Sequence, residues 1–521
     1  MITLRELFAE FPFTFSPLAL PELPVSGIAI DSRKVVAGDL FVAMKGGSAD
    51  SHDYIPDALE RGAAAVIGEK TLAGLSVPYI RVDDPRRSLT WLAAAFHGYP
   101  GRKLTVIGVT GTDGKTTTCN LLYQILLAAG IRAGLISTVN AVIGNEVLDT
   151  GFHVTTPDAP DVQRYLAMMV AAGLTHVVLE TTSHGWAQHR VDACEFDVAV
   201  ITNITHEHLD QHGSYENYRA AKARLFQSLE ITRAKPQGNP RLAVLNRDDS
   251  SYEYLANLVH GPRVSYGLDA GADLQADSVS YSPQGIRFEV VGPGLQVPVQ
   301  SPLVGEFNVS NCLAAFSAAV RGLGLDPQTA ARGIANLPGV PGRMERIDLG
   351  QPFTALVDFA HTPNALRVAI ETVRKMTDRR VITVFGSAGL RDKEKRRMMA
   401  EVSAELADIS ILTAEDPRTE SLDGILEEMA AGARSKGGVE ETTFWRIPDR
   451  GEAIRAGVRM ALPGDIVMAC GKGHEQSMCF GDVEYPWDDR TAMRAALAEL
   501  LGVAGPAMPR LPTSGEPLDH S

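Results

Sequence analysis

The chain has 521 residues, and at roughly 100–200 residues per domain this length predicts about three domains. Hydrophobic residues make up 45% and charged residues 21% of the chain, a composition that is typical of soluble globular proteins and excludes a disordered or fibrous chain. The formal net charge of −14 disfavours nucleic acids and anionic membranes as partners, because both bind basic surfaces. We therefore expect no nucleic-acid partner.

The cysteines and the N-terminus indicate the compartment. The five cysteines are odd in number and none has Cys-x-x-Cys spacing, so the sequence predicts neither a disulfide framework nor a structural zinc site. The N-terminal stretch lacks the basic and apolar regions of an export signal, and no apolar run reaches the roughly 18 residues of a membrane span. We expect a cytoplasmic protein without a membrane span.

The first half of the chain predicts two α/β domains. Short apolar strand-like runs and a helical stretch at 54–62 lead up to a Tyr-Pro-Gly break at 99–101, which predicts a small domain over residues 1–100. From Leu104 a buried strand, a Gly-rich turn and a helix closed by Gly130 open a series of alternating strands and helices. This alternation predicts a central domain over 101–340, with a mostly parallel P-loop-type sheet covered on both faces.

The second half predicts a third α/β domain. A β-rich stretch over about 263–303 and a helix from Asn308 to Leu323 precede the Pro-Gly-Val-Pro-Gly cluster at 338–342, which indicates a linker. Further strand-like runs alternate with helices and predict a Rossmann-like domain over 341–505. The last residues are rich in Pro, Gly and Ser and predict a disordered tail over 506–521. The expected fold class is therefore α/β in three domains.

The segment GTDGKTTT at 111–118 has the composition of a phosphate loop. Glycines let backbone amides approach phosphates, a helix N-terminus adds positive dipole, Lys115 can reach the β- and γ-oxygens, and the Thr116 hydroxyl can bind Mg²⁺. The spacing is shorter than the full pattern because Val109 occupies the first glycine position, and an ordinary tight turn is the alternative. The predicted ATP-binding residues are Gly111, Thr112, Asp113, Gly114, Lys115, Thr116 and Thr117.

Acidic and imidazole groups follow neighbouring predicted strands. Glu180 ends the apolar run THVVLE, which would place its carboxylate at the C-terminal edge of the sheet, where ligands of α/β proteins bind. It is a candidate Mg²⁺ ligand, and a solvated strand end is the alternative. The segment THEHLDQHG at 205–213, which includes His208, fits a loop lining a magnesium–phosphate site at least as well as a zinc site. Taken alone, Lys222 has the pattern of a solvated helical lysine.

Ten motifs, in order along the chain, resemble those of the Mur ligases, the ATP-dependent amino-acid ligases of peptidoglycan precursor synthesis. They are similar to the members that add the third peptide residue. Besides GTDGKTTT and THEHLDQHG, the motifs are DSRKVVAGDLFVAMKG (31–46), TTPDA (155–159), ETTSHGWAQHRV (180–191), GEFNVSN (305–311), VPGRMERI (340–347), VDFAHTPNAL (357–366), VFGSAGLRDKEKR (384–396) and CGKGHEQ (470–476).

The resemblance implies roles for the matching residues. Ser32 and His52 are implied to line a uridine-nucleotide pocket. The residues implied to grip the muramoyl-dipeptide are Thr155, Thr156, Ser183, Gln188 and Arg190. The residues implied to line the nucleotide side are Asn308, Arg343, Asp358 and His361. The implied metal ligands are Thr116, Glu180, His208 and Lys222, the last carried as a carbamate. The implied catalytic residues are Lys115, Glu180, His208 and Lys222.

The resemblance also implies the reaction. The D-glutamate carboxylate of a UDP-linked muramoyl-dipeptide attacks the γ-phosphorus of ATP, and the amine of a diamino acid then attacks the resulting acyl-phosphate to leave an amide. Mg²⁺ and Lys115 neutralise the two anionic reactants. The implied cofactors are therefore ATP and Mg²⁺, the implied partners are UDP-N-acetylmuramoyl-L-alanyl-D-glutamate and a diamino acid, and we expect a monomer.

The sequence gives conflicting indications of which amino acid is the acceptor. Family members that take meso-diaminopimelate carry Asp-Asn-Pro-Arg where this chain has Glu-Asp-Pro-Arg at 415–418. Arg418 suits the second carboxylate of diaminopimelate and Glu475 suits its distal ammonium, whereas Asp416 would repel that carboxylate and favour L-lysine or L-ornithine. The residues implied to bind the acceptor are Arg391, Asp416, Arg418, Gly471 and Glu475. Diaminopimelate is slightly favoured.

Two other functions are compatible with the phosphate loop. A folylpolyglutamate-synthase-like ligase shares it but lacks a first domain such as the one that carries Asp31-Ser32-Arg33. The other alternative is an inactive scaffold that binds the cell-wall precursor without turnover. Retention of Lys115, Glu180 and the other implied catalytic residues favours an enzyme.

Overall fold

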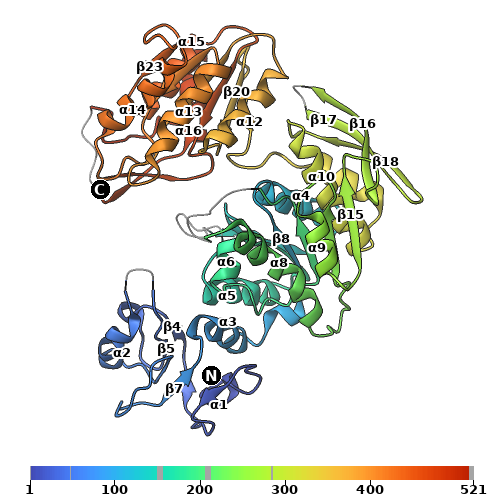
Figure 1. Ribbon diagram of the computed structural model, residues 1–521, viewed down its shortest axis with the longest axis vertical. Helices are drawn as coiled ribbons and strands as arrows, with labels where there is room; N and C mark the ends of the chain where they lie inside the picture. The colour runs from blue at the N-terminus through green and yellow to red at the C-terminus, as the bar shows by residue number, and fades with distance from the viewer. Residues whose placement is uncertain (1, 47–48, 149–155, 206–212, 283–284, 516–521) are drawn as a thin grey trace. The chain divides into compact units, whose positions relative to one another are not determined.

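The computed structural model describes residues 2–46, 49–148, 156–205, 213–282 and 285–515 (Figure 1). The chain divides into two compact units. Unit 1 comprises Met1–Asp277, Glu289–Val299 and Ser310–Asn336, and unit 2 comprises Ser278–Phe288, Gln300–Val309 and Leu337–Ser521. The last boundary falls next to the predicted linker at 338–342. No helix within the described ranges has the length and apolar character needed to cross a membrane.

The first 100 residues contain their own small sheet, as their apolar runs predict. Its strand order is β2 (Phe15–Ser16), β7 (Tyr79–Val82), β6 (Ala65–Gly68), β5 (Leu40–Val42) and β4 (Ile28–Ala29). The strands from β4 to β7 are parallel, and β2 is antiparallel to β7. Short strands β1 (Ile2–Thr3) and β3 (Pro24–Val25) pair beside helix α1 (Leu4–Leu7), and α2 (Ile55–Glu60) and α3 (Pro85–Phe96) complete this part.

A second, larger sheet follows. Its order among the described strands is β11 (Glu146–Leu148), β10 (Ala141–Ile143), β9 (Ala133–Ile136), β12 (His176–Glu180), β8 (Thr105–Thr110), β13 (Val198–Ile201), β14 (Leu242–Asn246), β15 (Arg263–Gly267), β16 (Leu274–Ser282), β17 (Gly285–Gly292) and β18 (Leu295–Ser301). The strands from β9 through β16 in this order are parallel. The β-rich stretch predicted at about 263–303 is therefore confirmed, and it forms one end of the sheet.

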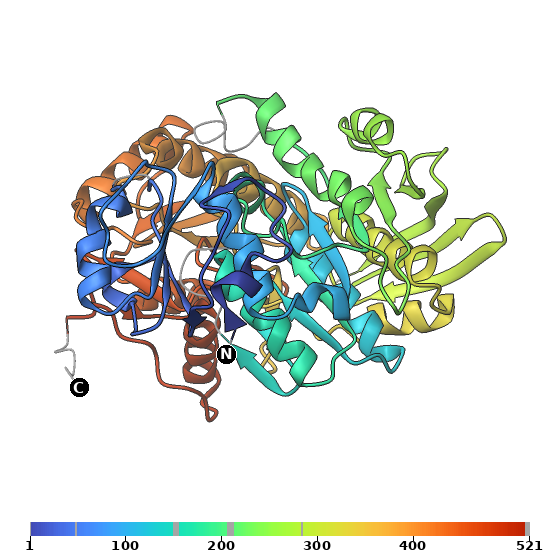
Figure 2. The ribbon, with the colours of Figure 1, turned by 90° about the horizontal axis from the view of Figure 1, so that it is seen from below.

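Helices cover both faces of this sheet. Val106 of β8 shares a core with α5 (Ala159–Ala171) and α8 (Tyr215–Ile231), and α8 packs along β8, β13 and β14 (Figure 2). On the other side α4 (Lys115–Ala128) packs on β8, β9 and β12, and α11 (Pro327–Ala335) packs on α4. Among the residues that the structure describes, this part also contains α6 (Ser183–Ala187), α9 (Tyr252–Leu258) and α10 (Phe307–Ser317), the last continued by a π-helical turn at Ala318–Gly322.

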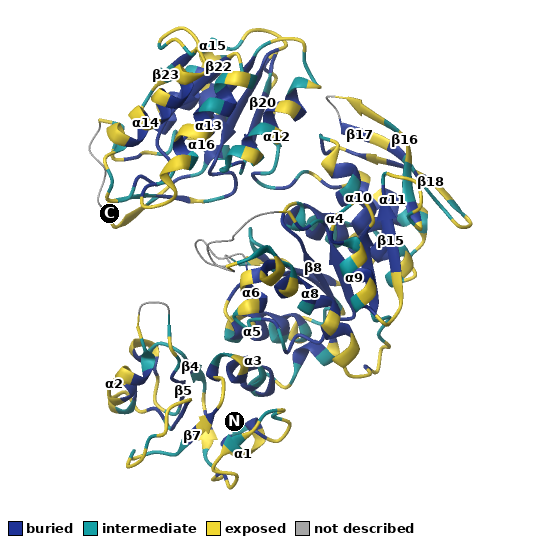
Figure 3. Ribbon diagram, viewed as in Figure 1, coloured by how far each residue is buried: buried dark blue, intermediate teal, exposed yellow. Residues whose placement is uncertain are grey.

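The sheet of unit 2 has the order β19 (Glu345–Ile347), β20 (Thr354–Asp358), β24 (Ile466–Cys470), β21 (Val381–Phe385), β22 (Ile409–Leu412) and β23 (Phe444–Arg446). All of its strands except β19 are parallel. One face packs on α15 (Arg450–Met460) and α16 (Asp489–Leu501), and the other on α12 (Pro363–Arg374), α13 (Lys393–Leu406) and α14 (Leu422–Ser435). The inner strands β21, β22 and β24 are buried along their whole length (Figure 3). A hairpin of β25 (Ser477–Phe480) and β26 (Val483–Pro486) follows β24.

The C-terminal residues differ from the prediction of a disordered tail from Pro506. Leu511 is 1% exposed and belongs to the core beneath α15 and α16. The Thr513 hydroxyl donates to the Asp449 carboxylate at 2.8 Å. The prediction is wrong for residues 506–515, because a few apolar side chains in a polar segment are enough to anchor it, and residues 516–521 lie outside the described ranges.

Candidate functional site

The phosphate loop connects β8 to α4 as the sequence predicts. Gly114 is the N-cap of α4, has φ +80°, and provides no side-chain capping hydrogen bond. A Cβ on Gly114 would lie 2.2 Å from Asn311 Oδ1, and one on Gly111, where φ is +152°, would lie 1.8 Å from Thr202 Oγ1. Both positions therefore require glycine, and the first-turn amides of α4 form a cradle suited to an anion.

Residues after β13 fix the loop from outside. The Asp113 amide donates to Asn203 Oδ1 at 2.9 Å, and the Thr112 amide donates to the Asn203 carbonyl at 2.8 Å. The Thr202 hydroxyl donates to the Asp113 carbonyl at 2.5 Å. Asp113 itself is exposed, so its backbone shapes the loop while its carboxylate is solvated. Thr202 and Asn203 are not among the predicted site residues, although their place directly after a buried sheet strand is the signal that could have found them.

Glu180 lies at the loop, and the prediction for its position is confirmed. It ends β12 and pairs in register with Val109 of β8. Its carboxylate is 1% exposed and accepts hydrogen bonds from the Thr116 hydroxyl at 3.1 Å, from the Thr138 amide at 3.0 Å and from the Thr138 hydroxyl at 2.8 Å. The alternative of a solvated strand end is therefore wrong. Lys115 donates to the Thr112 carbonyl at 2.7 Å, which keeps its ammonium against the loop.

This set of oxygens fits Mg²⁺. The Thr116 hydroxyl and the Glu180 carboxylate are hard donors beside an anion cradle, and Mg²⁺ binds through one or two protein oxygens together with phosphates and water. Within the described ranges there is no group of three His, Cys, Asp or Glu side chains that could hold a metal by itself. The predicted ligand His208, with the rest of the segment 206–212, lies outside the described residues, as does Thr155.

Lys222 projects from α8 to the same loop. The residue is 2% exposed, and its Nζ donates to the Gly111 carbonyl at 2.5 Å. The Nζ lies 4.5 Å from the centroid of the Tyr218 ring, whose hydroxyl is 3.0 Å from Thr112 Oγ1. A solvated helical lysine is therefore the wrong interpretation, and the side chain belongs to the phosphate site.

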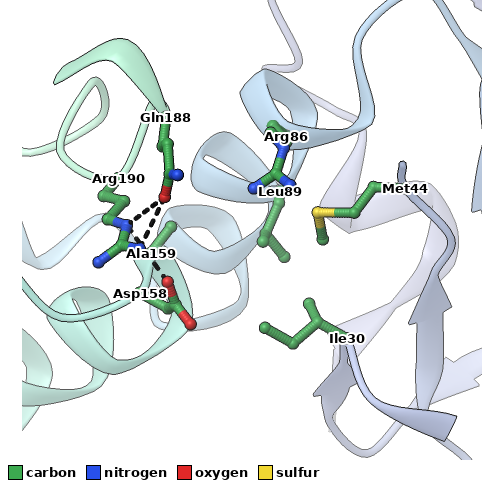
Figure 4. Close-up of a pocket in the computed structure, with 8 residues that line it drawn as sticks. All are labelled: Ile30, Met44, Arg86, Leu89, Asp158, Ala159, Gln188 and Arg190. Atoms are coloured by element: carbon green, nitrogen blue, oxygen red, sulfur yellow. Dashed lines mark hydrogen bonds and ion pairs between the residues drawn. The ribbon is translucent and has the colours of Figure 1, made fainter. Parts of the chain in front are cut away.

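A pocket in unit 1 contains two of the predicted substrate residues (Figure 4). Arg190 donates to Gln188 Oε1 from Nε at 3.0 Å and from Nη2 at 2.6 Å, to the Thr156 carbonyl at 2.5 Å, and pairs with Asp158 at 3.3 Å. Burial lowers the pKa of the Arg190 guanidinium, and Asp158 opposes that shift. The pocket-lining residues are Ile30, Met44, Arg86, Leu89, Asp158, Ala159, Gln188 and Arg190.

Ser32, His52, Thr156 and Ser183, which are also implied to bind the UDP-linked substrate, are not among the residues that line this pocket. Ser32 is buried in a 3₁₀ turn capped by Asp31. His52 is 7% exposed, with Nδ1 2.6 Å from Asp50 and Nε2 accepting the Glu69 amide at 3.3 Å. Since both ring nitrogens have protein partners, His52 supports the backbone of the first domain. Thr156 and Ser183 are buried near Glu180 and at the start of α6.

In unit 2, three predicted nucleotide residues meet at the C-terminal end of β20. Asp358 accepts the Met344 amide at 2.7 Å and the Ala360 amide at 2.8 Å, and burial raises the pKa of its carboxyl although Arg343 opposes the shift. Arg343 lies over the Phe359 ring at 4.4 Å. Burial lowers the pKa of His361 to about 4, so its imidazole is neutral at pH 7. Separately, the buried Asn308 donates to the Val304 carbonyl at 2.7 Å.

The predicted acceptor residues lie on three loops, which follow β21, β22 and β24. Both Asp416 oxygens accept from Lys472 Nζ, at 3.0 and 3.1 Å, and Lys472 also pairs with Glu475 at 2.5 Å. Asp416 is therefore ion-paired, and the interpretation that it repels an acceptor carboxylate stays a prediction. Arg391 is exposed. Gly471 has φ +112°, and a Cβ there would lie 2.3 Å from Glu415 Oε2, so this position requires glycine. Lys472 is not among the predicted site residues, although it lies inside the CGKGHEQ motif.

Comparison with known proteins matches most of the chain to one family. The Mur ligase family, catalytic domain, matches residues 24–97, the Mur ligase middle domain matches 109–319, and the Mur ligase, glutamate ligase domain, matches 342–473. A UDP-N-acetylmuramyl-tripeptide synthetase of Roseiflexus sp. (strain RS-1) is 45% identical over 485 residues, or 91% of this chain and 95% of the relative.

Two further similarities agree with this match. A UDP-N-acetylmuramoyl-L-alanyl-D-glutamate–2,6-diaminopimelate ligase of Geobacillus thermodenitrificans (strain NG80-2) is 41% identical over 477 residues, or 91% of this chain and 95% of the relative. The solved structure of another UDP-N-acetylmuramoyl-L-alanyl-D-glutamate–2,6-diaminopimelate ligase is 32% identical to this chain and has a TM-score of 0.68. The alignment covers 96% of this chain and 99% of the chain of that ligase.

Proposed function

Because the chain belongs to the Mur ligase family, we propose that it is an ATP-dependent ligase that adds a diamino acid to the D-glutamate of UDP-N-acetylmuramoyl-L-alanyl-D-glutamate. The observation that carries the proposal is the phosphate loop, where Thr116 meets the buried Glu180 carboxylate and Lys222 meets the Gly111 carbonyl. The names of the relatives support the choice of substrates.

The phosphates of ATP are proposed to lie at the N-terminus of α4. Gly114 leaves the first-turn amides without a capping side chain, so these amides can donate to phosphate oxygens. Lys115 starts the helix and adds a cation that can move from the Thr112 carbonyl to a phosphate. Thr116 and Glu180 would hold Mg²⁺, which supplies further positive charge against the phosphates when bound. His208 is proposed as an additional ligand.

Lys222 is proposed to carry a carbamate. It matches the lysine that the family carries in this form, and its buried Nζ at the phosphate loop supports the assignment. Reaction of the neutral amine with CO₂ forms an N–C bond and releases one proton. The product replaces a cation by an anion, which suits a site that attracts Mg²⁺.

The UDP-linked dipeptide is proposed to use the pocket beside Arg190. Two guanidinium groups, Arg86 and Arg190, line it against the single carboxylate of Asp158, so the pocket is cationic within an acidic protein and suits an anionic ligand. Gln188 and the Thr156 carbonyl fix the Arg190 guanidinium, which keeps that cation in place before the substrate arrives.

In the proposed reaction the D-glutamate carboxylate attacks the γ-phosphorus and ADP leaves. The first-turn amides of α4 and Lys115 stabilise the charge on the transferred phosphoryl group. The amine of the acceptor then attacks the acyl carbon, and phosphate and a proton leave as the amide forms. Because water hydrolyses an acyl-phosphate, a productive site must exclude water during this interval.

Meso-diaminopimelate is proposed as the acceptor, with L-lysine or L-ornithine as the alternative. Support comes from the relatives named as diaminopimelate ligases, from Arg418 and Glu475 at their expected positions, and from the pairing of Asp416 with Lys472. In that pairing Asp416 shares its charge with Lys472, which weakens the argument for a plain diamine. Arg391 and Gly471 are proposed to complete the acceptor site.

We further propose the domain limits, the compartment and the oligomeric state. The three matched family domains support domain limits of 1–100, 101–340 and 341–505. The five cysteines are free in the structure, which supports the cytoplasm as the compartment, and we propose a monomer. A folylpolyglutamate-synthase-like activity is disfavoured by the match of residues 24–97 to a Mur ligase domain.

The test is ATP-dependent phosphate release with UDP-N-acetylmuramoyl-L-alanyl-D-glutamate and each of meso-diaminopimelate, L-lysine and L-ornithine, with the tripeptide product identified by mass. We expect release that requires both substrates and is fastest with diaminopimelate. A preference for lysine or ornithine would replace the acceptor but keep the reaction. No release with any acceptor would favour a precursor-binding scaffold.

A further inference from the structure

Two loops of unit 2 share one buried lysine. Lys472 lies just after β24, and its side chain is 0% exposed. Its Nζ contacts Asp416, which follows β22, at 3.0 Å, and Glu475, three residues further along its own loop, at 2.5 Å. Burial disfavours the ammonium, yet the two carboxylates raise the pKa of Lys472 above its ordinary value. The lysine is therefore charged at pH 7.

The charges of this triad do not cancel. One ammonium faces two carboxylates, so Asp416, Lys472 and Glu475 together carry one negative charge. The Asp416 side chain is 10% exposed and the Glu475 side chain is 23% exposed, so solvent and ligands have better access to Glu475. With asparagine at 416, Lys472 and Glu475 would form a neutral pair, and the surplus negative charge would disappear.

The backbone holds Asp416 in place for this contact. Asp416 has φ +41° and Arg418 has φ +54°, a left-handed conformation that Asp and Asn tolerate better than other residues that carry a Cβ. Asp416 Oδ1 accepts the Cys479 amide at 2.9 Å, and the Arg418 amide donates to the Cys479 carbonyl at 3.1 Å. The carboxylate is therefore fixed from the hairpin side, and it reaches Lys472 without rearrangement.

We propose that Asp416 is a positioning residue that acts through Lys472: by sharing the lysine charge, it leaves Glu475 as the anionic ligand for the distal ammonium of the acceptor amino acid. This inference rests on the proposed function, since it concerns the acceptor of that reaction. It replaces the interpretation of Asp416 as a selector against diaminopimelate. Diaminopimelate, lysine and ornithine all carry a distal ammonium, so Asp416 favours all of them over acceptors that lack this group.

The test compares wild type with D416N for acceptors that differ only in the distal ammonium. L-lysine and meso-diaminopimelate are compared with L-norleucine and L-2-aminopimelate, which have similar chains without it. We expect D416N to raise KM for the two diamino acids by about fivefold to tenfold, with kcat and KM for ATP unchanged, because an ionic contact is weakened and not removed. The KM values for norleucine and aminopimelate, and the ratio of diaminopimelate to lysine, should not change.

Controls separate this effect from disturbance of the loop. D482N removes a carboxylate from the exposed turn between β25 and β26 and should leave every KM as in wild type. E475Q should reproduce the selective loss more strongly. If D416N melts at a lower temperature than wild type, D416G, which tolerates the positive φ, replaces it in the comparison.

The outcomes are distinct. Equal KM increases for all four acceptors would assign Asp416 a purely structural role and overturn the proposal. A shift in D416N toward diaminopimelate over lysine would restore the selector interpretation and also overturn it. If wild type releases no phosphate with any acceptor, the proposed function fails before the variants are compared, so the two failures are distinguishable.

Discussion

Lys222 combines features that rarely occur together, since it is a lysine that is 2% exposed and donates to a backbone carbonyl of a phosphate loop. Lysine is seldom buried without a strong reason, because desolvation of an ammonium is costly. A carbamate offers such a reason. It adds an anion where Thr116 and Glu180 already supply oxygen ligands, and it would increase the affinity of that site for a divalent cation.

We predict that Lys222→Ala lowers kcat by at least about a hundredfold and that added short carboxylic acids restore part of the activity, because they can occupy the space and charge of the lost carbamate. Lys222→Arg keeps a cation and should not be rescued. The measurement is ATP-dependent phosphate release, together with the intact mass of the wild type in bicarbonate. Full turnover by the alanine variant would exclude the carbamate role.

At the scale of single elements, a buried side chain at the start of α15 holds the strand ends from which two of the acceptor loops begin. Arg450 starts α15 and is completely buried with Asp489, to which it donates at 2.7 and 2.6 Å. The same guanidinium donates to the carbonyls of Ala414, after β22, at 3.0 Å and of Cys470, at the end of β24, at 2.8 Å. One rigid group therefore links the two strand ends from which the acceptor loops begin.

Breaking this buried pair should be costly. Arg450→Met leaves Asp489 charged and both carbonyls unpaired, and we predict a loss of about 3–5 kcal/mol in the stability of unit 2, measured as a fall in its thermal unfolding temperature. Asp489→Asn should cost less, because the amide oxygen still accepts. KM for the acceptor should rise in Arg450→Met while KM for ATP stays constant. An unchanged melting temperature in Arg450→Met would show that the pair does not stabilise the unit.

Local sequence patterns predict the position of a site residue correctly when one strand or helix alone determines that position. A carboxylate at the end of an apolar parallel strand must lie at the C-terminal sheet edge, and Glu180 does so. Patterns failed where a contact joins distant elements. Asn203 reaches the loop because β13 lies beside β8, and Lys472 meets Asp416 across the β24–β21–β22 order. No local spacing encodes these pairings, so Asp416 was interpreted as an isolated charge.

At the scale of the whole chain, alternating strands and helices predicted the α/β class and the separate sheets, because periodicity and turn residues are local properties. The tail shows the limit of composition. A segment rich in Pro, Gly and Ser predicts disorder, yet Leu511 packs into the core of unit 2. A few apolar side chains, Leu511 among them, are enough to order this segment, and the average composition of a segment does not reveal them.

The two-unit architecture places the phosphate loop wholly within unit 1, so ligand binding to it should be visible in the stability of the folded protein. We predict that ATP with Mg²⁺ raises the thermal unfolding temperature, since a ligand at 100 times its Kd stabilises the native state by about 2.7 kcal/mol. Lys115→Met should abolish the shift, because the phosphates lose the cation at the start of α4. Chelation of Mg²⁺ should also abolish it, because Thr116 and Glu180 alone do not neutralise the phosphate charge.

Lys103→Met is the matched control, because Lys103 is an exposed lysine of the same unit outside the loop. This variant should show the same temperature shift as wild type. A shift that survives in Lys115→Met would place the nucleotide elsewhere in the protein, and a shift that survives chelation would remove the role of the metal in nucleotide binding.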